Sequence, residues 1–348
     1  MLEILFLILF LIIFVLIVNY FVSFKNLALF LTILTICVVV LGAYVRLSDA
    51  GLGCPDWPGC YGTLTVPQSE SAIAHAQVTY PDSPVEHGKA WKEMLHRYLA
   101  GALGLLVLAI FVQAWRMRGQ IKVAAWLPSF LLALIVFQAA LGMWTVTLLL
   151  RPIIVSAHLI GGMTTLAILT WIAHRHWGVI PNTVQSQNTR FWVRGAVLIL
   201  FMQIFLGGWT STNYAALACT DFPTCHGVWI PAMDFSNAFN WFRELGVGND
   251  GQPLPLAAYT AIQWTHRIGA LVTFVYIGWL GLSLLKQPQL KKIAHIMLAL
   301  LVIQIILGIA NLVLHLPLTL AVGHNMGAAL LLISVVVLNS KITTLKAK

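Results

Sequence analysis

The chain is dominated by long apolar runs separated by polar segments. Nine runs are long enough to cross a hydrocarbon core as helices, at about 3–23, 27–46, 96–115, 124–148, 153–173, 192–211, 258–285, 291–314 and 318–340. A core of about 30 Å needs roughly 20 residues per helix. The runs are apolar throughout, whereas strands of a membrane barrel would alternate, so each run predicts an α-helix.

The last eight runs form an internal repeat of two four-helix units. Shifts of 165, 166 and 170 residues pair Cys54 and Cys60 with Cys219 and Cys225, His158 with His324, and His96 with His266. Because each unit holds an even number of spans, both enter the membrane in the same direction. The sequence therefore predicts an all-α polytopic membrane protein built from two parallel-repeat four-helix bundles. A pseudo-twofold axis along the membrane normal relates them, and one extra N-terminal span precedes them.

This organisation divides the chain into an extra transmembrane segment (1–24), an N-terminal half (25–180) and a C-terminal half (181–348). The first segment has Glu3 near its start and lacks the basic region and small-residue cleavage site of a secretory signal. We expect a retained span with its N-terminus outside. A cleaved or peripheral segment is the alternative.

Composition and charge placement support a membrane protein. Of 348 residues, 59% are apolar and only 9% are charged. The net charge of +9 could suggest nucleic-acid binding, but the charges are distributed by side of the membrane. By the positive-inside rule, one alternate set of loops and ends is cytoplasmic, and the loops 47–95 and 212–257, with the acidic residues, face outside. The basic set is Lys25, Arg116, Arg118, Lys122, Arg175, Arg190, Arg194, Lys286, Lys291, Lys292, Lys341, Lys346 and Lys348.

Four histidines occupy equivalent places near the outer ends of the second and fourth helices of each half: His96, His158, His266 and His324. Two imidazoles that face each other across a four-helix bundle can hold haem iron, so the pattern predicts two haem sites. The alternative is four helix-end histidines that are solvated or hydrogen-bonded. Zinc is disfavoured because Glu93 is the only thiolate or carboxylate nearby.

Glu93 distinguishes the two halves. It precedes His96 by three residues and shares its helix face, whereas Gln263 stands three residues before His266. The fold therefore does not require a charge at this position, and a carboxylate beside a haem could transfer a proton. The alternative is an acid that stabilises the start of a helix.

The neighbouring residues allow two interpretations each. Arg97 and Arg267 could bind haem propionates or reach lipid phosphates. The Cys54–Cys60 and Cys219–Cys225 pairs lie on the oxidising side and predict two structural disulfides, with a redox role for the first pair as the sharper alternative.

Two further features are interpreted as packing. Cys37 lies inside a predicted span. Gln138, Gln203 and Gln304 each precede a glycine by four residues, a spacing that allows helices to approach closely.

The ordered set of Glu93, His96, His158, His266 and His324, with the cysteine pairs, resembles the haem A synthase family over about residues 27–340. The resemblance implies an oxidoreductase acting on a CH group, which converts a methyl group of haem O to a formyl group for terminal oxidases. It implies haem b as cofactor on His266 and His324, substrate haem at His96 and His158, and Glu93 as the catalytic residue. The extra first span lies outside the usual pattern of eight helices.

The expected partners are haem O, a haem O synthase (farnesyltransferase) as supplier, an electron acceptor of unknown identity and membrane lipid, without nucleic acid; homo-oligomerisation is left open. The expected location is the bacterial inner membrane, with the haem sites near the outer face, because no transit peptide precedes the first span. The main alternative is a bis-histidyl electron carrier resembling a membrane cytochrome b. A transporter ranks last, because the spans lack polar residues at mid-depth.

Overall fold

The residues that a computed structural model describes, 13–121, 123, 124, 126–177 and 187–342, form helices joined by loops and no named strand. Within these residues, eight helices are long and apolar enough to cross a membrane, which confirms the predicted multi-pass helical class. They are α2 (Phe24–Leu47), α4 (His87–Arg116), α5 (Trp126–Thr147), α6 (Pro152–Trp177), α7 (Gln187–Thr212), α9 (Leu256–Leu284), α10 (Pro288–Val313) and α11 (Leu318–Ile342).

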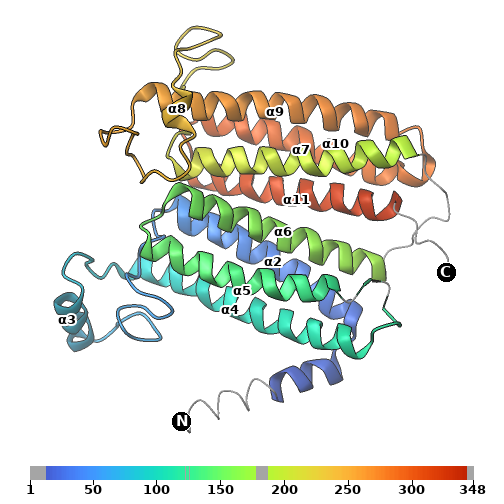
Figure 1. Cartoon of the computed structure of the whole chain (residues 1–348), viewed down its shortest axis with the longest axis horizontal. Coiled ribbons are helices and arrows are strands. Elements are labelled where there is room, and N and C mark those ends of the chain that lie inside the picture. The colour runs from blue at the N-terminus through green and yellow to red at the C-terminus, as the bar shows by residue number, and fades with distance from the viewer. Residues whose placement is uncertain (1–12, 122, 125, 178–186, 343–348) are drawn as a thin grey trace.

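The eight helices lie side by side in two groups of four (Figure 1). We call α2, α4, α5 and α6 the N-half, and α7, α9, α10 and α11 the C-half. In the N-half the main contacts run from α2 to α4, α5, α6 and back to α2, and the C-half repeats this order from α7. Helices α4 and α6 are therefore diagonal to each other, as are α9 and α11. The two groups meet through α6 with α7, α11 with α2, and α6 with α11.

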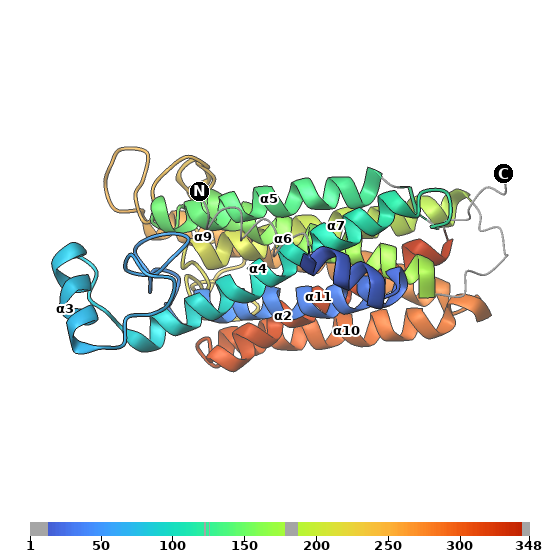
Figure 2. The same ribbon diagram turned by 90° about the horizontal axis from the view of Figure 1, so that it is seen from below.

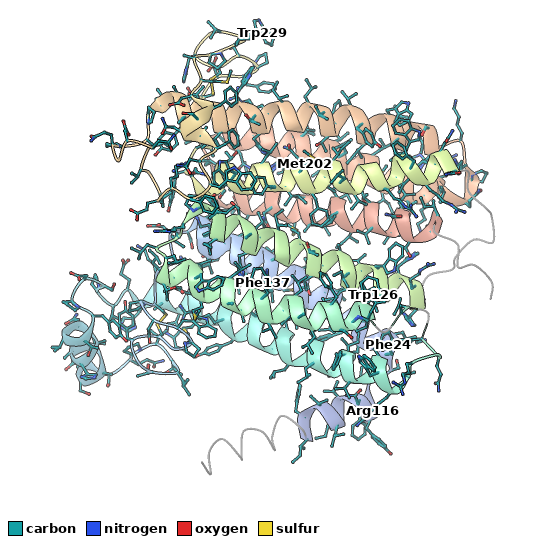
Figure 3. All side chains as sticks on the ribbon, viewed as in Figure 1. Phe24, Arg116, Trp126, Phe137, Met202 and Trp229 are labelled. Atoms are coloured by element: carbon teal, nitrogen blue, oxygen red, sulfur yellow. A yellow bond between two sulfur atoms is a disulfide. The ribbon has the colours of Figure 1, made fainter. Side chains whose placement is uncertain are left out.

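Apolar side chains cover the outside of the bundle and also fill its interior. Phe137 on α5 and Met202 on α7 point away from the helices (Figure 3), and 51% and 60% of their surfaces are exposed. Leu166 and Leu331 are fully or nearly fully buried between helices of the two groups. A chain with an apolar exterior of this kind matches a lipid environment, in which close packing rather than the hydrophobic effect holds helices together.

The two long loops lie at the same end of the bundle, and helix α11 ends at the other (Figures 1 and 2). Short helices interrupt both loops, α3 (Glu70–Thr79) in the first and α8 (Phe235–Ala238) in the second. Helix α3 projects beyond the ends of the membrane helices. Arg116 marks the opposite end (Figure 3), where the described members of the predicted basic set also fall. Lys122, Lys346 and Lys348 lie outside the described residues.

Helix α4 begins at His87, nine residues before the predicted start at about 96. The sequence-based boundary was wrong because charged residues lower the apolarity of the first turns. Those turns are covered by the loop that precedes them: Gly53 lies so close to the backbone of Lys89 that a Cβ atom would stand 2.6 Å from its carbonyl carbon. Glu93 and His96 therefore lie well inside a helix rather than at its mouth.

Two other expectations concern the first part of the chain. Residues 13–21 are helical, and Gln113 Nε2 on α4 donates to the Val22 carbonyl at 2.6 Å. Residues 1–12 lie outside the described part, so the extra span stays a prediction. The packing role of Cys37 was wrong, because its side chain is exposed and Thr35 and Val38 occupy the buried face of α2.

Candidate functional site

Each of the four predicted histidines packs against a glycine of a neighbouring helix. A Cβ atom on the glycine would lie 2.9 to 3.1 Å from the histidine Cε1 in three of the pairs, so alanine would press on the ring, and 3.7 Å away, in ordinary contact, at Gly142. The four glycines occupy equivalent places on the first and third helices of each half, a regularity that sequence reasoning missed although the repeat alignment contained it. The pairs are Gly42 with His96, Gly142 with His158, Gly207 with His266, and Gly308 with His324.

The histidines fall into two pairs on diagonal helices. His96 on α4 and His158 on α6 lie within electrostatic range of each other, as do His266 on α9 and His324 on α11. All four side chains are partly buried. Among the described residues, the buried Nδ1 atoms of His96, His158 and His324 have no hydrogen-bond partner.

A buried polar atom without a partner costs about 1–3 kcal/mol, which a bound group can offset. Paired imidazoles from opposite helices are the ligands that haem iron takes in helix bundles. The residues present therefore fit one haem group per half.

In the N-half, Glu93 connects the histidine helix to the first disulfide loop. Its Oε2 accepts a hydrogen bond from the Cys54 amide at 2.9 Å, and its Oε1 forms a buried ion pair with Arg97. Arg97 also donates to the backbone carbonyls of Asp56, at 2.8 Å, and Gly59. The predicted Cys54–Cys60 disulfide closes this loop.

The C-half repeats this frame with an amide in place of the carboxylate. Gln263 Oε1 accepts from the Cys219 amide at 2.6 Å, and its Nε2 donates to the Ala216 carbonyl at 2.5 Å. Arg267 donates to the carbonyls of Thr224, Cys219 and Asp221 at 2.8 to 2.9 Å. The Cys219–Cys225 disulfide is also present. Glu93 and Gln263 thus hold equivalent loops, and the side chain that accepts from the first cysteine amide is charged only in the N-half.

The arginines bind loop backbone in both halves, which sequence reasoning did not anticipate. Their proposed contact with haem propionates stays a prediction, as does a redox role for the first cysteine pair.

In the second loop, Asp221 accepts hydrogen bonds from the Thr224 hydroxyl and from the amides of Gly227 and His226. These bonds, led by that from Thr224, hold the pKa of Asp221 well below its usual range.

These features define a multi-pass helical membrane protein with a pair of histidines in each of two helix groups and a disulfide-closed loop over each pair. Residues 25–336 match the family model COX15-CtaA, cytochrome oxidase assembly protein, and the chain belongs to this family.

Individual relatives carry one name. The chain is 45% identical over 309 residues to a protein of Shewanella oneidensis named Heme A synthase, which covers 88% of this chain and 93% of the relative. Proteins of the same name from Caulobacter vibrioides and Bacillus licheniformis are 28% and 24% identical, over 85% and 87% of this chain and 89% and 90% of their own lengths.

Proposed function

We propose that the protein is a haem A synthase, which oxidises a methyl group of haem O to a formyl group. The observation that carries the proposal is the presence of two equivalent histidine pairs with a carboxylate beside only one of them. The relatives' shared name supports the same reaction. A protein that only carried electrons would have no need for this asymmetry.

The two halves would divide the work. His96 and His158 of the N-half (25–180) would receive the substrate haem, and His266 and His324 of the C-half (181–348) would hold a haem b cofactor. The matching helix contacts of the two groups support a parallel repeat with a pseudo-twofold axis along the membrane normal. Residues 1–24 would form an additional membrane segment.

The reaction would proceed by two successive hydroxylations of the methyl carbon. Each would replace a C–H bond with a C–O bond to a water oxygen, pass two electrons to the separate electron acceptor and release two protons. The resulting gem-diol would then lose water to leave the aldehyde. Bound haem supplies one-electron chemistry. The protein's own part is to position the substrate through the histidines and to provide Glu93 near the reacting edge. Glu93 would take up a proton or stabilise positive charge that develops at the carbon. Arg97, paired with Glu93, holds this carboxylate beside the Cys54 amide.

The enzyme would act in the bacterial inner membrane with its histidine pairs near the outer face, because the basic helix ends lie away from the long loops. A farnesyltransferase that makes haem O would supply the substrate, and a separate electron acceptor would complete the oxidation.

The test is chemical analysis of haem from cells that express this chain together with a haem O supply. Mass analysis and pyridine haemochrome spectra are expected to show haem A for the wild type. Glu93→Gln should keep the hydrogen bond to Cys54, as Gln263 does to Cys219, and abolish haem A. Glu86→Gln is the matched control, because Glu86 is an exposed acid whose ion pair, among the described residues, is with Lys89. Unmodified haem in the wild type, or normal haem A in Glu93→Gln, would refute the assignment.

A further inference from the structure

In the C-half, a glutamine amide contacts each histidine of the pair. Gln203 on α7 places Nε2 3.0 Å from Nδ1 of His266 and donates to the His266 carbonyl at 3.2 Å. Gln304 on α10 places Nε2 3.4 Å from Nε2 of His324 and donates to its carbonyl at 3.0 Å. Both glutamines thus bind the ring and the backbone of the same residue, which restrains the imidazole.

The same contact can serve a ligating histidine. The buried Oε1 atoms of Gln203 and Gln304 have no partner among the described residues. If the Gln203 amide turned by 180°, Oε1 would accept a hydrogen bond from the protonated Nδ1 of His266, in exchange for the bond that Nε2 donates to the His266 carbonyl. That bond leaves Nε2 of His266 free for iron and raises the basicity of the ligand. Gln304 contacts Nε2 of His324 instead, which leaves the buried Nδ1 of that histidine for iron.

A second glycine, three residues after the histidine, makes room for each amide. A Cβ atom on Gly269 would collide with Gln203, and one on Gly327 would collide with Gln304. In the N-half, Gly161 stands three residues after His158 and makes room for Gln138, although Gln138 Nε2 and His158 Nδ1 have no hydrogen-bond partner among the described residues. We call the glutamine together with this second glycine the clasp.

His96 alone of the four histidines lacks the clasp. Val38 stands where the glutamine would be, four residues before Gly42, and Leu99 stands where the second glycine would be. Val38 is buried, with 8% of its surface exposed. Both members of the clasp are therefore replaced at His96: an apolar side chain stands in place of the amide, and leucine stands in place of the glycine.

We propose that the missing clasp makes His96 the weakly held iron ligand, so that haem exchanges at the N-half while the clasps on His266 and His324 retain haem at the C-half. This inference rests on the proposed function, because an enzyme whose substrate and product are both haems must release haem at one site and keep it at the other. Val38, Leu99, Gln203 and Gln304 are then positioning residues that act through the histidines.

The test installs the clasp at His96 with the double variant Val38→Gln/Leu99→Gly. The purified full chain is saturated with haem b, and transfer of haem to excess apomyoglobin is followed by absorbance. The wild type should show a fast and a slow phase. The variant should slow the fast phase by about 10- to 100-fold, the range by which partners of metal ligands change affinity, and leave the slow phase unchanged. Val38→Leu/Leu99→Gly, which provides space but no amide, is the matched control and should not slow release.

The reverse variant tests the same idea without new packing in the N-half. Gln203→Leu/Gln304→Leu should accelerate the slow phase by a similar factor. The inference would be overturned if either folded variant released haem with the wild-type phases, or if Val38→Leu/Leu99→Gly slowed the fast phase as much as Val38→Gln/Leu99→Gly. If Val38→Gln/Leu99→Gly does not fold, the reverse variant decides. Release is measured without turnover. Failure to make haem A would therefore refute the proposed function, whereas unresponsive release phases would refute this inference alone.

Discussion

The two disulfide loops show how one backbone frame can carry different chemistry. In both loops a side chain four residues before an arginine binds the amide of the first cysteine, and the arginine binds loop carbonyls. The N-half uses Glu93 with an ion pair to Arg97, whereas the C-half uses the neutral Gln263. Because the amide is sufficient to hold the loop, the charge of Glu93 is not explained by folding. On the proposed function, this comparison favours the N-half as the reaction site, which the repeat positions of the four histidines alone do not.

The largest expected effect separates the halves by haem content. On the proposed assignment, His266→Ala or His324→Ala should eliminate the haem that survives purification, because each removes an iron ligand of the retained site. His96→Ala and His158→Ala should leave that haem in place. The measurement is the ratio of haem to protein by pyridine haemochrome. Equal loss in all four variants would show that the halves do not differ in this way.

The next effect compares the two arginines. Arg97→Met leaves the buried Glu93 carboxylate without its partner and should destabilise the protein by about 3–5 kcal/mol. Arg267→Met removes hydrogen bonds to carbonyls but strands no charge, so a cost of about 1–3 kcal/mol is expected. Thermal unfolding in detergent measures the stability of both variants. The rate at which a reductant cleaves each disulfide shows which loop has been loosened. If Arg267→Met were as damaging as Arg97→Met, the ion pair would not distinguish the loops.

A smaller effect is expected when a carboxylate is introduced at the equivalent position of the C-half. Gln263→Glu should keep the bond from the Cys219 amide through one carboxylate oxygen but lose the donation to the Ala216 carbonyl. A stability loss of about 1–3 kcal/mol is expected, roughly the cost of leaving a buried polar group unpaired. Haem A formation should continue, because Glu93 is untouched. Product analysis checks this, and loss of product with haem still bound would contradict a catalytic role confined to the N-half.

The smallest effect concerns pH and the second loop. The folded pKa of Asp221 lies below its unfolded value because the Thr224 hydroxyl and the amides of Gly227 and His226 bind the carboxylate. The stabilisation is therefore fully present above the unfolded pKa of about 4 and is lost as the pH falls through the folded pKa. Hydrogen-exchange protection of the His226 and Gly227 amides should decrease over that acid range. Asp221→Asn should show weaker protection with little pH dependence, and a wild-type profile in this variant would contradict the interpretation.

The fold was largely predictable because membrane helices are long and apolar, and because the repeat identifies equivalent residues. The four histidines, the disulfides and the departure at Glu93 all follow from comparing the chain with itself. The start of α4 was not predictable from hydropathy, since its first turns are polar and are covered by residues near Gly53. The role of Gln203 was also missed, because a glutamine four residues before a glycine has the same spacing as a simple packing motif. Its contact with His266 depends on two helices that are distant in sequence.

The diagonal placement of each histidine pair has a consequence for how the protein is made. Both histidines of the first pair, and the glycines behind them, precede residue 178, so no element of the second pair is needed to assemble the first. During synthesis, the first site can be completed in the membrane while the later helices are still emerging. The contacts of α6 with α7 and of α2 with α11 form only afterwards. The order of the chain therefore permits the first histidine pair to be assembled before the second pair has been synthesised.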